Sequence, residues 1–242
     1  MKRKRAGLAI TGLLVVAIIA VGATLALLST TTGTKTNAFS SNRNISIQLR
    51  EDKWDGYTFE DGAGDSTTGE EAIEGHEEDM TLGVNQAKAY LPGQSIPKNP
   101  TVKNNNTNGN GVETRVALKV TYFIGGQQVT YETFKTTLLD TDTNNGIAFD
   151  TDNWTKIQNS SDEKLADIYL YDKELGLEED NKTTEKNTTT PLFSTVPINK
   201  NLQPGEDGKL PSFNINVQAY AIQAGIDDMN IGEEMVKFIN AN

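Results

Sequence analysis

The chain has 242 residues, a formal net charge of −11 at pH 7, one histidine and no cysteine. Its acidic excess disfavours nucleic acid and anionic membrane surfaces as partners, because binding a polyanion requires clustered Lys and Arg side chains. The lack of cysteine excludes disulfides and cysteine nucleophiles, and the lack of both a cysteine and a second histidine excludes the usual zinc sites. Stability must therefore come from a buried core and from backbone hydrogen bonds.

The N-terminus has the pattern of an export signal. A basic cluster, Lys2–Arg5, precedes an apolar run from Ala6 to Leu28 that ends in small residues. This pattern predicts a secretory signal peptide at residues 1–26, so the protein is expected to be secreted or held at the cell surface. The run is also long enough to span a membrane, and a retained hydrophobic helix that anchors the chain is the alternative. Without these residues the remaining chain carries a charge of −15.

Short runs of β-branched and aromatic residues, separated by Asn-, Asp- and Gly-rich clusters, predict an all-β fold. The clearest strand is Thr114 to Phe123, where apolar and polar residues alternate. The Gly125-Gly126 pair predicts a hairpin turn into a second strand near Gln128 to Leu139. Further strands are expected at Ile45 to Leu49, Asp167 to Tyr171, Leu192 to Ile198 and Phe213 to Ala221. An antiparallel β-sandwich over residues 45–242 follows.

Three segments, 55–79, 103–111 and 176–190, are too polar to bury anything and are expected to be surface loops or insertions. One short helix is expected near the C-terminus. Its apolar residues, Ile231 to Ile239, share one face, and Asn230 with Glu233 resembles a capping box. Residues 27–44 form a Thr-, Ser- and Asn-rich arm ahead of the sandwich.

No catalytic motif emerges from the sequence. His76 begins His76-Glu77-Glu78-Asp79-Met80, but Met80 stands where a zinc-protease helix needs its second histidine. Adjacent carboxylates in an acidic loop cannot hold the fixed separation that glycoside hydrolysis requires. The chain is therefore expected not to be an enzyme.

One oxygen-rich stretch could bind calcium, which prefers carboxylate and carbonyl ligands. Its spacing departs from the helix-loop-helix calcium motif, so an ordinary Asx-rich turn is the alternative. No other cofactor is expected. The candidate ligands are Asp140, Asp142, Asn144, Asp150 and Asp152.

Several segments occur together in an order and spacing typical of one family. The signal sequence Val21–Leu28 is followed by the strand Ile45–Leu49 and by Leu91–Val102, with its Pro-Gly and Lys-x-Pro elements. With these segments, the chain resembles the TasA/camelysin family of exported proteins of Gram-positive bacteria over nearly its whole length. The other matching segments are Arg115–Val120, Trp154, Ile168–Tyr171, Thr190–Phe193 and Val217–Ala224.

The resemblance implies a jelly-roll-like β-sandwich and cleavage between Ala26 and Leu27 by a SipW-type signal peptidase. It also implies a cell-surface or biofilm-matrix protein with a companion anchoring protein, since similar proteins are surface or matrix components, some of which assemble into fibres. The acidic segment Asp55–Asp79 and the Asn-rich segment Asn104–Asn110 have no counterpart in this resemblance.

The arm suggests how such a protein could self-associate. Phe39 is its apolar anchor, and it leads into the alternating residues Ile45, Ile47 and Leu49. An arm of this kind can add a strand to another subunit, and a head-to-tail contact that does not close generates filaments. The same segment could instead pair within its own sandwich.

The leading hypothesis is a non-enzymatic structural protein of the cell surface or extracellular matrix that forms fibres by N-terminal strand exchange. The main alternative is a monomeric adhesin or glycan-binding module. A camelysin-like metallopeptidase is disfavoured because no metal-binding motif is present. The aromatic residues that could stack on a glycan are Trp54, Tyr57, Phe59 and Trp154.

Overall fold

The structure is a computed structural model that describes residues 29–31, 44–61, 69–107, 111–142, 145–177, 182–225 and 230–242. The expected signal peptide, its cleavage position between Ala26 and Leu27, and Phe39 lie outside these residues. Within the described ranges, no helix is both long and apolar enough to cross a membrane.

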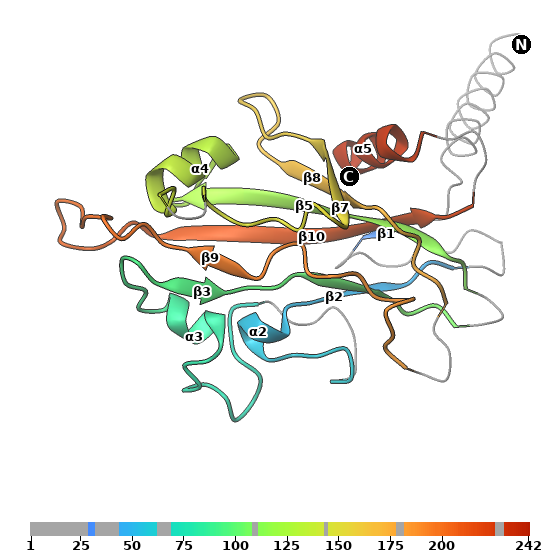
Figure 1. The fold of residues 1–242 in the computed structure, drawn as a ribbon, viewed down its shortest axis with the longest axis horizontal. Coiled ribbons are helices and arrows are strands. Elements are labelled where there is room, and N and C mark those ends of the chain that lie inside the picture. Colours follow the sequence, from blue (N-terminus) through green and yellow to red (C-terminus); the bar gives the residue numbers. More distant parts are fainter. Residues whose placement is uncertain are drawn as a thin grey trace, which may run out of the picture.

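Two long antiparallel strands, β5 (Thr114–Ile124) and β10 (Phe213–Gln223), pair along their whole length at the centre of the larger sheet (Figure 1). The sheet order is β1-β10-β5-β8-β7, and β6 pairs with β5 beyond the hairpin turn. Gly125 and Gly126 adopt the positive φ angles predicted for that turn. The other strands of this sheet are β1 (Ser29–Thr31), β6 (Gln127–Val129), β7 (Trp154–Gln158) and β8 (Asp167–Tyr171).

Two smaller antiparallel sheets face the larger one and form a second layer, drawn below β5 and β10 in Figure 1. One pairs β2 (Ile47–Arg50) with β4 (Thr101–Asn104), and the other pairs β3 (Ser95–Pro97) with β9 (Thr195–Pro197). The predicted mainly β, antiparallel architecture is confirmed, although the expected strand Leu192 to Ile198 is shortened to β9.

The main core lies between the two layers. Alternate residues of β5 and β10 point into it, because successive side chains of a strand face opposite sides of the sheet. The second layer contributes the apolar residues of its own strands. The core includes Val116, Leu118, Val120, Ala219 and Ala221 from the large sheet, and Ile47, Ile96, Val102 and Val196 from the small sheets.

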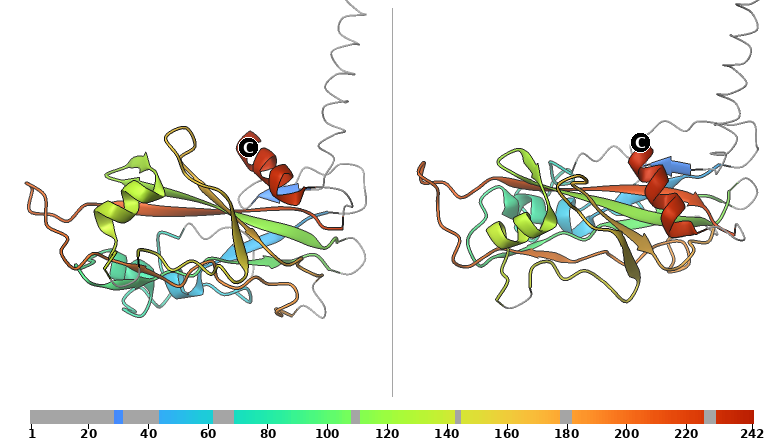
Figure 2. Two further views of the ribbon diagram at one scale, coloured as in Figure 1. Left: turned by 45° about the horizontal axis from the view of Figure 1, so that its top comes forward. Right: turned by 90° about the horizontal axis from the view of Figure 1, so that it is seen from above.

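The opposite face of the large sheet is covered by α5 (Ile231–Ala241), the predicted C-terminal helix (Figure 2). Met235 and Ile239 of this helix are fully buried against Ala117 and Tyr220. The side chain of Asn230 accepts a hydrogen bond from the backbone N–H of Glu233, which satisfies one of the free N–H groups of the first turn.

The expected strand Gln128 to Leu139 is wrong beyond β6, where the chain forms the helix α4 (Tyr131–Leu138). Thr130 caps this helix by accepting a hydrogen bond from the backbone N–H of Thr133. Tyr131, Phe134 and Leu138 then fall at helical spacing, and their side chains are buried in the main core. Two short helices were also not predicted, α2 (Asp52–Asp55) and α3 (Gly83–Ala87).

The expectation that the polar segments bury nothing is also wrong. Asn104 is fully buried and donates from its side-chain amide to the carbonyl oxygens of Val112 and Leu175, each at 3.1 Å. Asn106 is buried beside it and accepts a hydrogen bond from the backbone N–H of Ser46 at 3.0 Å. The side-chain amides thus supply hydrogen-bond partners to backbone groups that are buried away from water. Asn187, Thr189, Asp55 and Ala72 are buried in the other two segments.

We expect Asn104→Ala to lower the free energy of unfolding by about 2–3 kcal/mol, because two buried hydrogen bonds from the Asn104 amide are lost and the buried backbone N–H of Asn106 loses Asn104 Oδ1 as its acceptor. Urea unfolding followed by circular dichroism measures the change. Asn105→Ala is the matched control, since Asn105 is only half-buried and its amide makes a 3.4 Å contact with Gln48. Equal losses in the two variants would contradict a special role for Asn104.

Candidate functional site

One edge of strand β10 pairs with few of the residues that the structure describes. Its other edge pairs with β5 from Phe213 to Gln223, whereas β1 covers this edge only at Tyr220–Ile222. Among the described residues, no strand pairs with this edge from Phe213 to Ala219. Unpaired backbone N–H and C=O groups on a strand edge are a template for an added strand.

A groove of about 1190 Å³ lies beside this open edge, between the two layers of the sandwich. Phe213, Ile215 and Val217 of β10 face it and are only half-buried, although they belong to the core face of the strand. The half-exposure of core-facing side chains marks the place where the sandwich is incomplete. The opposite wall is formed by Leu49, Ile96, Val196, Val84, Ala87 and Tyr90.

One end of the groove is polar. Lys98 Nζ lies 2.6 Å from Glu51 Oε2 and 4.8 Å from the centroid of the Trp54 ring. The side chains of Lys98 and Glu51 are only 8% and 13% exposed. Glu51 Oε1 is buried and has no hydrogen-bond partner. Burying two charges is costly, and an unsatisfied oxygen adds to that cost.

The turn between β3 and β4 holds this polar end in place. Asn99, next to Lys98, accepts a hydrogen bond from the backbone N–H of Lys53 at 2.9 Å and donates from its amide to the Asp52 carboxylate. The turn therefore fastens α2 from two sides. These residues belong to the Lys-x-Pro element noted in the sequence, but the sequence did not reveal Glu51 as the partner of Lys98.

Asp55 is the most unusual carboxyl group of the groove. It is 3% exposed, and this burial raises its pKa to about 6. The backbone N–H of Tyr57 donates to Asp55 Oδ1 at 3.0 Å and partly offsets the rise, while the negative charge of Glu51 adds to it. Sequence reasoning placed Asp55 in a solvated acidic loop. Trp54 within that acidic run was the one sign of a buried environment.

The second half of the calcium stretch is engaged in turns. The Asp150 carboxylate accepts hydrogen bonds from the Asn153 amide and from the Thr190 hydroxyl at 2.6 Å. The backbone N–H of Asp152 also donates to Asp150. These contacts tie the loop before β7 to the segment that precedes β9.

The first half of the stretch behaves similarly. Asp140 accepts from the backbone N–H of Asp142, and the Asp142 carboxylate lies 3.3 Å from Lys200 Nζ. Asn144 lies outside the described residues. In the part of the chain that the structure describes, no three His, Cys, Asp or Glu residues form a group that could hold a metal ion. The calcium hypothesis gains no geometric support.

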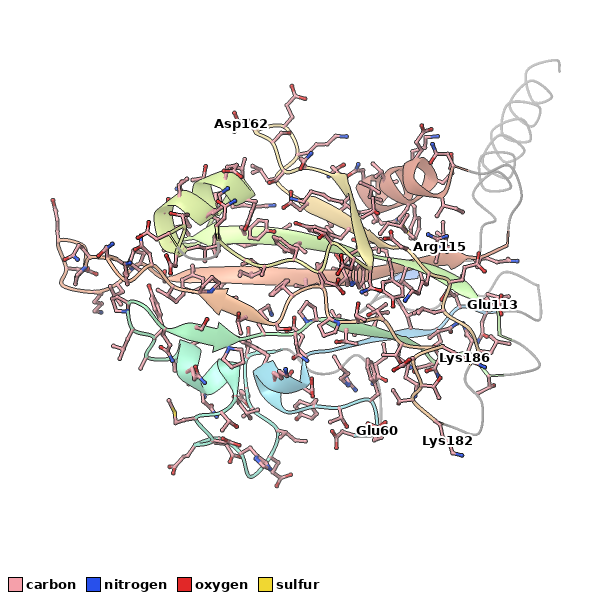
Figure 3. The ribbon with its side chains drawn as sticks, viewed as in Figure 1. Glu60, Glu113, Arg115, Asp162, Lys182 and Lys186 are labelled. Carbon is pink, nitrogen blue, oxygen red and sulfur yellow. The ribbon has the colours of Figure 1, made fainter. Side chains whose placement is uncertain are left out.

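The remaining candidates for chemistry are scattered. His76 is exposed and its Nδ1 lies 3.5 Å from Asp79. Figure 3 shows Glu60, Glu113 and Asp162 in separate parts of the molecule, and none of them lines the groove. Of the aromatic residues considered for glycan stacking, Trp154 is buried in the core. The described residues thus form one pronounced concave feature, the groove beside β10.

The segment considered for strand exchange splits between two environments. Ile45 and Ile47 are buried in the core of their own chain, and β2 pairs with β4 of the same chain. Leu49 lines the groove. Residues from Ile45 onward therefore help to build the groove and its sandwich, and they are not free to leave it.

Comparison with models of known families, with curated proteins and with solved structures finds no match to this chain. The resemblance to the TasA/camelysin family accordingly stays an expectation from the sequence.

We expect acidification to stabilise the protein through Asp55. Since the folded-state pKa of about 6 is above the model value of 3.8, this stabilisation is complete below about pH 4 and is lost as the pH rises through 6. Asp55→Asn should therefore raise the free energy of unfolding at neutral pH by up to about 3 kcal/mol and bring no gain near pH 4. Urea unfolding between these pH values measures both effects.

Asp61 provides the matched contrast in the same loop. Hydrogen bonds from the backbone N–H and the hydroxyl of Thr58 lower the pKa of this exposed carboxyl group. Its contribution to stability is present at neutral pH and is lost on acidification, so Asp61→Asn should lower stability at neutral pH. The same pH trend for both variants would contradict the assignment of Asp55.

Proposed function

We propose that this protein is an exported, non-enzymatic structural protein of the bacterial surface or extracellular matrix. It assembles into fibres when the N-terminal arm of one copy adds a strand to the groove of the next. The observation that carries this proposal is the open edge of β10 beside an apolar groove. The resemblance to a family of exported proteins, some of which form fibres, supports the proposal. The proposal includes what that resemblance implies: a jelly-roll-like topology, processing by a SipW-type signal peptidase and a companion anchoring protein.

Strand addition suits the chemistry of this groove. The backbone groups of β10 from Phe213 to Ala219 can form ladder hydrogen bonds with an incoming strand. Alternate side chains of that strand would enter the groove and cover Phe213, Ile215 and Val217. The incoming strand would therefore pair with the β10 backbone and bury the apolar side chains beside it, which would complete the sandwich at this edge.

The chain's own arm is too short to fill this edge. Continuing β1 along β10 to Phe213 takes about 23 Å, and returning past the Thr114 end of β5 takes about another 33 Å, at about 3.3 Å per residue. Asn44, the next described residue, bridges to Gly111 beyond that end. Residues 32–43 reach at most about 47 Å when fully extended, so they cannot pair as far as Phe213 and return to Asn44. In this proposal a second copy supplies the strand for the part of the edge near Phe213.

The alternative is a monomeric adhesin that binds a glycan in the same groove. Trp54 and Tyr90 line the groove, and aromatic rings can stack on sugars. Two contacts weigh against it: Lys98 covers the Trp54 ring, and the Tyr90 hydroxyl is bound to the carbonyl oxygen of Pro211 at 2.5 Å.

The first test compares residues 27–242 with a chain that begins at Asn44. The shorter chain keeps the described residues from Asn44 onward and loses β1, which pairs with β10 only at Tyr220–Ile222. We expect filaments from the longer form alone, seen by size-exclusion chromatography and negative-stain electron microscopy at mildly acidic and neutral pH. Acidification should favour assembly, because it reduces the repulsion between strongly acidic chains. Monomers from both forms would favour the adhesin and lead to glycan-array screening.

The second test places a charge in the groove. Val217→Lys in residues 27–242 should abolish filaments, because an ammonium group would have to be buried when the donor strand binds. Gln127→Lys is the control, since Gln127 of β6 is exposed in the same large sheet and does not line the groove. Electron microscopy and sedimentation measure the polymer. Filaments from both variants would exclude this groove as the acceptor.

A further inference from the structure

We propose that the polar end of the groove is a site of internal cross-linking, where the Lys98 amine and the Glu51 side-chain carboxyl group form an amide bond. The bond would join α2 to the turn between β3 and β4. This inference does not depend on fibre assembly, because all its residues belong to one chain.

The two reacting groups are already in contact. Lys98 Nζ lies 2.6 Å from Glu51 Oε2, which brings the nitrogen close to the carboxyl carbon. Both side chains are largely buried, and the Trp54 ring lies against the amine. Reacting groups held together in a fixed orientation gain a large effective concentration, and partial exclusion of water disfavours hydrolysis of the product.

The hydrogen bonding of Glu51 is incomplete in a way that suits this reaction. Its Oε1 is buried and has no partner, so the charged pair leaves one carboxylate oxygen unsatisfied. Amide formation would remove one of the two carboxylate oxygens and both buried charges. The reaction would relieve a cost that the ion pair carries.

A second ion pair, Lys156 with Asp167 in the large sheet, differs from Lys98–Glu51 in its hydrogen bonding. Asp167 Oδ2 lies 3.0 Å from Lys156 Nζ and also accepts from the Tyr122 and Tyr169 hydroxyl groups. Asp167 Oδ1 accepts from the backbone N–H of Ser160. Both oxygens are satisfied, so this pair is a structural ion pair and serves as an internal control.

We assign the proton transfers to Asp55, the ionisable residue that follows Glu51 by one helical turn. Its backbone N–H bonds to the Glu51 carbonyl oxygen at 3.1 Å, so the two residues are one helical turn apart, and Asp55 interacts electrostatically with both reacting groups. Its raised pKa of about 6 gives a substantial protonated fraction at mildly acidic pH. A carboxyl group with this property can act as general acid and then as general base.

The reaction balances without a further reagent. One proton first passes within the ion pair from the Lys98 ammonium group to the Glu51 carboxylate. The neutral amine then attacks the carboxyl carbon, the N–C bond forms, and one C–O bond breaks. Asp55 gives its proton to the departing oxygen and takes one from the nitrogen. In total two protons pass from the ammonium nitrogen to that oxygen, which leaves as water, and Asp55 returns to its starting state.

Intact-mass spectrometry of folded residues 27–242, incubated at mildly acidic pH, tests the proposal. We expect a species lighter by one water. Trypsin should then fail to cleave after Lys98 and should release Glu51–Lys53 joined to Ala89–Lys103. Folded protein that keeps its unmodified mass throughout the incubation would overturn the proposal, as would a water loss that maps to any other pair.

Three variants locate the bond. Lys98→Arg keeps the positive charge but removes the reactive amine, so the water loss should disappear. Asp55→Ala should slow bond formation at least tenfold, and an unchanged rate would refute the role given to Asp55. Lys156→Arg, at the satisfied pair, should leave the mass change intact. Circular dichroism confirms that each variant is folded, and water loss in Lys98→Arg would refute the assignment.

Discussion

The pairing of β5 with β10 is the constraint on which the rest of the structure depends. Its register places Val120 opposite Val217 and Leu118 opposite Ala219, so each strand directs one set of side chains to the inner core. The alternate set, including Ala117 and Tyr220, faces α5. A shift of one residue would exchange the two faces, because side chains alternate along a strand. The main core and the core beneath α5 therefore both depend on the register of the β5–β10 pairing.

The same pairing makes the sheet asymmetric. β5 has neighbours on both sides, whereas within the described part of the chain β10 has only the short β1 on its outer edge. The second layer follows the large sheet but does not close against this edge, which leaves the groove between Val217 and residues such as Ile96. An incomplete sandwich of this kind combines a stable scaffold with a surface that can still bury apolar area. The proposed function uses that combination.

Buried polar groups divide into two kinds in this protein. Asn104 and Asn106 are neutral amides that satisfy backbone groups, so they stabilise a segment that its composition predicted to be a surface loop. Lys98, Glu51 and Asp55 are ionisable, and their hydrogen bonding is incomplete. The first kind explains how polar segments join the core. The second kind concentrates electrostatic cost in one place, as is common at sites with a function.

The alternation of apolar residues in Thr114–Phe123 and Phe213–Ala221 determined the two central strands, and the helical spacing after Asn230 determined α5. These patterns are local, so the sequence alone revealed them. Only the tertiary structure decided that Tyr131–Leu138 is a helix. The apolar residues of this stretch fit both the period of a strand and the period of a helix, and their burial favours the helix. The groove and the contact of Lys98 with Glu51 likewise join residues far apart in the chain. No local pattern reports which distant segments the strand pairing brings together or which strand edge it leaves open.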